Sequence, residues 1–176
     1  MSTTKRVFLT RLLQERDKFE LLLNRAGYTR RMTLKGVAGK WSIKDVLALI
    51  LTHEQFLADR MVEIANHEPY TPCRTQTALD AFLDEFGYPD FGSPLLDDTS
   101  PKEWVIERYR NISLDDVIAQ ELQAFTSIFA SLEKLPEPVL ARHNLYDRIA
   151  KHTWLHYREH TSGIKRWLNA NGMQIK

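Results

Sequence analysis

The chain has 176 residues, which is enough for one domain with a sizeable core and short for two. We therefore expect a single domain over residues 1–176. Hydrophobic residues make up 43% and charged residues 27%, a composition that excludes a wholly disordered chain. The 24 Lys and Arg balance 23 Asp and Glu, so the net charge of +1 gives no reason to expect nucleic acid or an acidic membrane as the main partner.

Neither a membrane span nor a disulfide is expected. The longest apolar run lies within residues 46–51, far short of the roughly 20 residues that cross a bilayer. Charged residues such as Arg11 and Glu15 interrupt the apolar positions near the N-terminus, so we expect no export signal. Cys73 is the only cysteine, which excludes an intrachain disulfide and favours a reducing cytoplasm. The expected location is cytoplasmic.

The N-terminal segment is predicted to form an amphipathic helix. Its apolar residues recur at steps of 4, 7 and 4, at Phe8, Leu12, Phe19 and Leu23. Thr3 or Thr4 can cap the start of this helix, and Gly27 can end it.

A second helix is predicted over residues 42–66. Ser42 followed by Asp45 is a variant of the capping box, and the acidic residue also favours the positive end of the helix dipole. The apolar stripe of this helix comprises Val46, Ile50, Leu57, Met61 and Ile64.

Residues 67–112 form a long connection to the next helix. Leu79, Phe82, Leu83 and Phe86 suggest a short helix within it, and Tyr88-Pro89 and Ser93-Pro94 mark turns. A connection of this length can run along the molecule, so the second and third long helices need not be antiparallel neighbours. A linker between separate domains is the rival interpretation, but the aromatic residues favour packing against the helices.

Two more amphipathic helices are predicted. One begins at Ser113, ends before Pro136, and has the apolar stripe Ile118, Leu122, Phe125, Phe129 and Leu132. The other covers about residues 147–169 and carries Ile149, His156, His160, Ile164 and Trp167 on one side. Each helix needs a partner for its apolar stripe, because isolated helices are marginal in water. Together they predict an all-α four-helix bundle.

Histidine carries the candidate chemistry. His152, His156 and His160 are each four residues apart, so they lie along one side of the last helix. Imidazoles at positions i and i+4 can bind one metal ion, and His53 lies on the apolar stripe of the second helix, from which it could meet them. We therefore predict His53, His156 and His160 as catalytic residues or as ligands of zinc, nickel or iron.

Each of these histidines also has a structural interpretation. A histidine at a helix seam is commonly a hydrogen-bonded core residue, and His152 is expected to support the site or to lie at the surface. Cys73 lies in a turn-rich segment with no basic neighbour closer than Arg74, so we expect it to be non-catalytic.

Two segments resemble a known family. The segment Trp41–Ala48, followed by Glu54, resembles the second-helix signature of the DinB-like superfamily, and residues 152–160, HTWLHYREH, resemble its closing helix. The second string and the long middle connection are most similar to the ClbS/DfsB branch. The resemblance implies a bacterial DinB-like four-helix bundle with a long crossover between its second and third helices, often dimeric.

The resemblance also implies a metal site and a function. The family's three ligand positions correspond to Leu49, His156 and His160, and since Leu49 cannot bind metal, we expect a divalent ion to be held weakly or not at all. Related proteins include thiol-dependent transferases, and the ClbS branch resembles a self-protection hydrolase. We expect a hydrolase or transferase of an unknown small molecule, with a homodimer as the expected assembly. The alternative is a non-catalytic protein that sequesters a metabolite.

Overall fold

The computed structural model describes residues 2–27, 32–97 and 100–172, and these residues form helices and connecting loops without a β-strand. Three long helices are α1 (Thr3–Ala26), α2 (Ile43–Ala65) and α5 (Leu114–Lys134). A fourth long helical stretch is continuous through α7 (Leu145–Ala150), the π-helical turn η1 (Lys151–Leu155) and α8 (His156–Ala170). The expectation of an all-α protein is confirmed.

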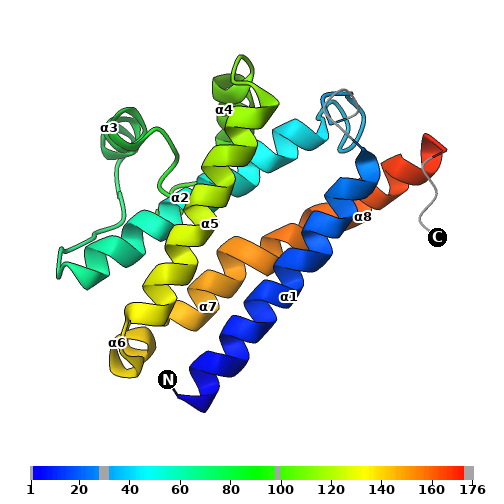
Figure 1. Ribbon diagram of the computed structural model, residues 1–176. Coiled ribbons are helices and arrows are strands. Elements are labelled where there is room, and N and C mark those ends of the chain that lie inside the picture. Colours follow the sequence, from blue (N-terminus) through cyan, green and yellow to red (C-terminus); the bar gives the residue numbers. More distant parts are fainter. Residues whose placement is uncertain (1, 28–31, 98–99, 173–176) are drawn as a thin grey trace.

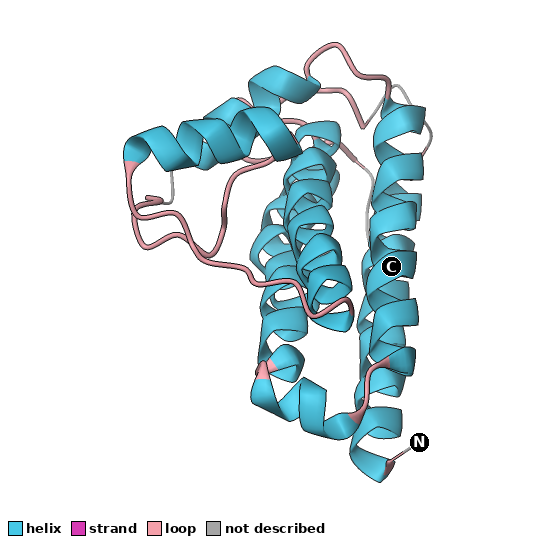
Figure 2. Ribbon diagram, turned by 90° about the vertical axis from the view of Figure 1, so that its left-hand side faces the viewer, coloured by secondary structure: helices cyan, strands magenta, loops and turns pink. Residues whose placement is uncertain are grey.

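The long helices lie side by side, as both ribbon views show (Figures 1 and 2). α2 packs most extensively on α5 and also meets η1 and α8, while α1 packs against η1 and α8. In Figure 1, α1 and α8 run in one direction and α2 and α5 in the other. The buried side chains between these helices include Leu12, Ile43, Ile50, Leu57, Met61, Ile128, Leu132, Ile149, Ile164 and Leu168.

The start signals read from the sequence hold for two helices and fail for one. Ser42 and Asp45 form the complete capping box of α2, and Ser113 caps α5. In α1 the cap is Ser2 rather than Thr3 or Thr4, because the Ser2 hydroxyl accepts a hydrogen bond from the amide of Lys5 at 3.0 Å. Gly27 ends α1, as expected, with a positive φ of 67°.

One predicted apolar stripe is wrong in part. On α5 the side chains of Phe125 and Leu132 are buried, but Ile118 is 40% exposed and Leu122 is 53% exposed. The helix is turned so that Val117 and Glu121 face inward instead. The buried residues of α5 also have helical spacing, and within this stripe Glu121 pairs with Arg16 of α1, as described below.

The connection between α2 and α5 contains α3 (Gln76–Phe86) and α4 (Ser100–Tyr109). Asp90 fixes its central loop: the buried carboxylate accepts hydrogen bonds from the Tyr70 hydroxyl at 2.5 Å and from the amides of Cys73 and Gly92 at 2.8 and 3.0 Å. This fold of the loop brings Phe91 against α2, where its ring stacks on His53. A short helix, α6 (Glu137–Arg142), joins α5 to α7. Among the described helices, none combines the length and apolarity that crossing a membrane requires.

Candidate functional site

Four imidazoles lie next to one another where the C-terminal helical stretch passes α2. Nδ1 of His53 lies 3.1 Å from Nδ1 of His152, and the rings of His53 and His156 have centroids 4.1 Å apart. Nε2 of His156 lies 3.2 Å from Nε2 of His160. Of the two alternatives expected for His152, a supporting residue or a surface residue, the surface position is wrong, because His152 is only 4% exposed and contacts His53 directly.

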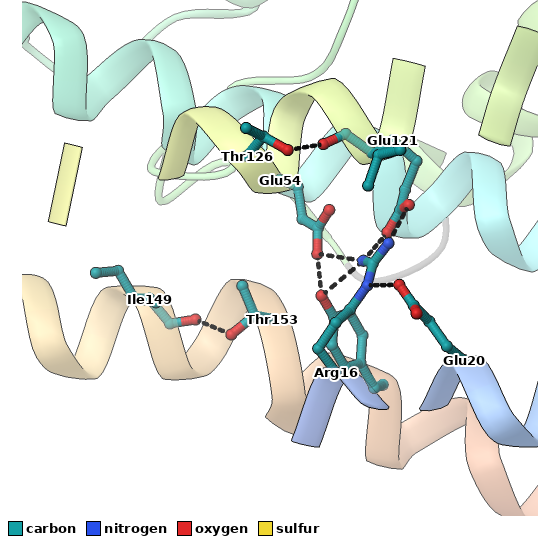
Figure 3. A network of polar contacts seen from close by, with 9 residues as sticks. Arg16, Glu20, Glu54, Glu121, Thr126, Ile149 and Thr153 are labelled. Carbon is teal, nitrogen blue, oxygen red and sulfur yellow. Dashed lines mark hydrogen bonds and ion pairs between the residues drawn. The ribbon is translucent and has the colours of Figure 1, made fainter. Parts of the chain in front are cut away.

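The π-helical turn η1 presents His152 to this cluster. Its residues His152, Thr153 and Trp154 are all buried, and the Thr153 hydroxyl donates a hydrogen bond to the carbonyl of Ile149 at 2.6 Å (Figure 3). A π-helical turn inserts extra backbone into a helix and re-aims the side chains that follow, and such turns are frequent at functional sites. The π-helical turn contains His152 and ends directly before His156, so it sets how these two histidines lie relative to each other.

A cavity of about 310 Å³ opens beside these rings, and we call it the imidazole cavity. Its wall is formed by residues of α2, the 91–97 loop, α4, η1 and α8: Leu49, His53, Phe91, Ser93, Leu96, Asp97, Pro101, Lys102, Lys151, His152, His156 and Glu159. The predicted residues His53 and His156 therefore line one cavity, together with His152. His160 contacts His156 but is not among the lining residues.

The imidazoles are held in their neutral form. Burial, followed by the neighbouring positive charges of Lys151 and Arg148, lowers the pKa of His152 to about 3. Burial lowers the pKa of His156 to about 3 and that of His160 to about 4, with Lys102 contributing to both. Burial also lowers the pKa of His53 well below its ordinary value. Neutral imidazoles keep the nitrogen lone pairs that a metal ion or a hydrogen-bond donor requires.

Three ligand atoms converge at one end of this cluster. Nitrogens of His156 and His160 and a carboxylate oxygen of Glu159 all lie within 4.8 Å of one another. His53 is not in that set, and its own Nδ1 faces His152. The sequence analysis did not consider Glu159 as a ligand, although its spacing of three residues from His156 places both on one helical face. Leu49, the position where the resemblance implies a ligand, is buried in the cavity wall.

A second polar cluster, which we call the core network, lies inside the packed helices (Figure 3). Arg16 of α1 forms a bidentate ion pair with Glu121 of α5, with Nη2 2.6 Å from Oε2. Its Nη1 lies 3.3 Å from the hydroxyl of Tyr157 and 3.8 Å from Oε1 of Glu54. Tyr157 donates a hydrogen bond to Glu54, which is completely buried.

The core network was not predicted, although the sequence carries a recognisable signal for it. Arg16 occupies a position on the apolar stripe of α1, four residues after Leu12 and three before Phe19. Glu54 lies on the buried side of α2 in the same way, between Ile50 and Leu57. Charged residues on apolar stripes of different helices indicate a buried ion pair.

Cys73 and the two remaining histidines of the chain lie away from the lining of the imidazole cavity. Cys73 is partly exposed, and burial followed by its contact with Asp90 raises its pKa to about 11, so its thiol stays protonated and unreactive at neutral pH. His67 and His143 are exposed.

Comparison of the chain with protein-family models, with curated proteins and with solved structures gives no match. Function is therefore inferred from the geometry of the imidazole cavity and from the two sequence motifs.

Proposed function

We propose that this chain is a DinB-like four-helix-bundle protein of the ClbS/DfsB kind, which hydrolyses a small molecule or transfers a group from it in detoxification or self-protection. One observation carries the proposal: the ligand atoms of His156, Glu159 and His160 converge within 4.8 Å beside a cavity of about 310 Å³. The opposite directions of the helix pairs, and the long connection between α2 and α5, support the bundle with a crossover.

These three residues fit a divalent metal ion. Two nitrogens bound to one tetrahedral ion at 2.0–2.1 Å lie about 3.4 Å apart, and the Nε2 atoms of His156 and His160 are 3.2 Å apart. The carboxylate of Glu159 offers the third ligand. The fit is that of a weak site, because Nδ1 of His156 is buried without a hydrogen-bond partner among the described residues, whereas metal-bound histidines normally have one.

A bound divalent ion would act as a Lewis acid that polarises a carbonyl or similar oxygen of the substrate. His53 and His152 share one proton between their Nδ1 atoms, since two lone pairs 3.1 Å apart would repel each other. Their lowered pKa values make both rings weak bases, so we assign them the orientation of substrate and water rather than the principal proton transfer. Lys102 and Lys151 offer positive charge to an anionic group of the substrate.

Metal uptake tests this proposal. Protein purified without a histidine tag should bind zinc weakly, and H156A and H160A should each abolish that uptake, as measured by calorimetry and elemental analysis. H67A is the matched control, because His67 is exposed and lies outside the cavity. L49H should raise the affinity at least tenfold, because an imidazole from the cavity wall would add a fourth ligand to His156, Glu159 and His160.

One result would overturn the metal site, and another would overturn the expectation that it is weak. If H156A and H160A bound zinc as the natural protein does, the converging ligand atoms would not be a metal site. If the natural protein bound one zinc per chain tightly and L49H changed nothing, a complete set of ligands would already exist. The variants H53A and E159Q would then identify the third ligand, because the loss of tight binding would fall on one of them.

Sequestration of a metabolite without turnover is the second candidate function. It is favoured by the low basicity of the four imidazoles, which limits proton transfer without a metal. A ligand that binds the natural protein, remains chemically unchanged with zinc present, and is released intact would support sequestration over catalysis.

A further inference from the structure

A second cavity, of about 340 Å³, lies beside α3, and we call it the α3 cavity. Its apolar wall is formed mainly by Leu79, Leu83, Leu95, Leu96 and Trp104. Leu95 is 51% exposed, an unusual amount for a leucine beside a cavity. Its polar lining residues are Gln76, Asp80, Asp90 and Asp97, and the carboxylate of Asp90 already accepts hydrogen bonds from Tyr70, Cys73 and Gly92. The leucines and Trp104 form a part of the α3 cavity that suits an apolar ligand group.

The α3 cavity and the imidazole cavity are neighbours. Both are open to solvent, and they share the residues Leu96, Asp97 and Pro101 as a common wall. A single ligand that lies across Leu96 can thus contact both. Each cavity is near the lower end of the 300–1,000 Å³ range for small-molecule sites, so a ligand of ordinary size would use the two together.

The two cavities differ in chemistry. The imidazole cavity has polar groups that converge on one space, with Lys102 and Lys151 as its cationic residues. Lys102 is close enough to His156 and His160 to act on both electrostatically. Asp97 and Glu159 balance the charges of these two lysines, so the zinc ion of the proposed function would supply the net positive charge that attracts an anionic, oxygen-bearing group. The α3 cavity instead offers leucines and a tryptophan. The pair of cavities matches the two ends of an amphipathic molecule.

We propose that the α3 cavity binds the apolar chain of an amphipathic small molecule whose anionic oxygen-bearing group lies in the imidazole cavity. This inference rests on the proposed function, for which it names the substrate class. The apolar chain anchors the molecule, and the polar group is thereby held beside His53, His156 and Glu159. Binding affinity should depend on chain length, because each methylene that enters the α3 cavity leaves water.

A series of straight-chain carboxylates from butanoate to decanoate tests the inference, with the zinc-supplemented full chain and concentrations below micelle formation. Titrations followed by calorimetry, and by tryptophan fluorescence, to which Trp104 in the cavity wall contributes, should show Kd falling by up to about fourfold for each added methylene. L95E should remove this dependence while zinc uptake stays unchanged. L21E is the matched control: Leu21 is 62% exposed on α1, and L21E should preserve the dependence.

The outcomes separate this inference from the proposed function. A Kd that does not change with chain length, or a dependence that L95E leaves intact, overturns the inference even if H156A abolishes zinc uptake. A dependence that L95E removes and L21E preserves supports it. If that pattern appears while H156A leaves zinc uptake unchanged, the α3 cavity is a chain-binding site and the metal part of the proposed function is wrong.

Discussion

Arg16 places a positive charge beside two buried carboxyl groups, those of Glu121 and Glu54. Burial alone would lower the pKa of Arg16, but its hydrogen bonds to Glu121 and the charge of that residue raise it. Burial, followed by the charge of Glu121, raises the pKa of Glu54 well above its ordinary value. The uncharged form of Glu54 is therefore favoured. Its Oε2 atom is buried without a hydrogen-bond partner among the described residues, and burying this atom costs less free energy when the carboxyl group is uncharged.

Replacement of Arg16 by Met should destabilise the protein strongly. It would leave Glu121 in the core without its cation, and breaking a buried pair in this way costs about 3–5 kcal/mol. Urea unfolding should show a correspondingly lower midpoint. Glu20 also pairs with Arg16, but its side chain is 47% exposed, so Glu20→Gln should cost at most about 1 kcal/mol. Equal effects of the two substitutions would contradict this account of the core network.

His152 should make stability depend on pH below neutrality. Its pKa is about 3 in the folded chain and about 6.5 when unfolded, so between these values the unfolded state binds more protons. The stabilisation is complete above pH 6.5 and is lost as pH falls, by up to about 1.4 kcal/mol per pH unit for one group. Urea unfolding, measured between pH 4 and pH 6 with chelator present, gives the free energy of unfolding at each pH. This free energy should depend less steeply on pH in His152→Gln than in the natural protein. An unchanged pH dependence of the unfolding free energy would show that folding does not lower the pKa of His152.

At the scale of the element, the sequence predicts helices well where capping and periodicity agree. The predicted range 42–66 corresponds to α2, because Ser42 and Asp45 fix its start and the apolar stripe is continuous. The predicted ending of α5 before Pro136 is also confirmed. Short side chains that hydrogen-bond to the backbone act locally, and this is why a single sequence contains their signal.

The orientation of α5 and the π-helical turn could not be predicted in this way. Two stripes on α5 fit helical spacing, and the buried one contains Glu121, which pairs with Arg16 105 positions away, whereas Ile118 and Leu122 are exposed. Similarly, η1 interrupts a pattern that reads as one regular helix. Both features depend on contacts between helices, which periodicity within one helix does not contain.

In the candidate site, too, contacts within one helix could be predicted from the sequence, and contacts between distant segments could not. The four-residue spacing of His156 and His160 predicted their proximity, since positions i and i+4 meet on any α-helix. The contributions of Phe91, Lys102 and Leu96 come from the long connection, whose path over α2 is set by tertiary hydrogen bonds such as those of Asp90. The predicted role of His53 as a metal ligand stays a prediction.

At the scale of the whole molecule, the directions of the helices explain the long connection. α2 and α5 pack together and run the same way, so the chain must return along the molecule between them (Figure 1). That return contains α3, α4 and the loop beside the imidazoles, and it contributes to both cavities. The connection that the helix order requires is thus also the segment that encloses the site.

Self-association is the property of the whole molecule that its surface predicts. Ile118 and Leu122, one turn apart on α5, are 40% and 53% exposed, and Leu13 on α1 is 42% exposed. A two-fold axis would bring the same patch of each copy together, and the net charge of +1 opposes this little. We expect light scattering at micromolar concentration to report about 41 kDa, twice the 20.5 kDa of one chain.

The double substitution I118E/L122E should convert this dimer into a monomer, because it places four like charges on a surface that two copies would bury. Both positions are exposed, so the fold should tolerate the change, and an unchanged far-UV circular dichroism spectrum would confirm it. L95E is the control, because Leu95 is exposed to a similar extent but lies in the wall of the α3 cavity and not on the surface of α5. A mass of about 20.5 kDa for the natural chain would exclude the dimer. A dimer that survives I118E/L122E would place its interface on another face.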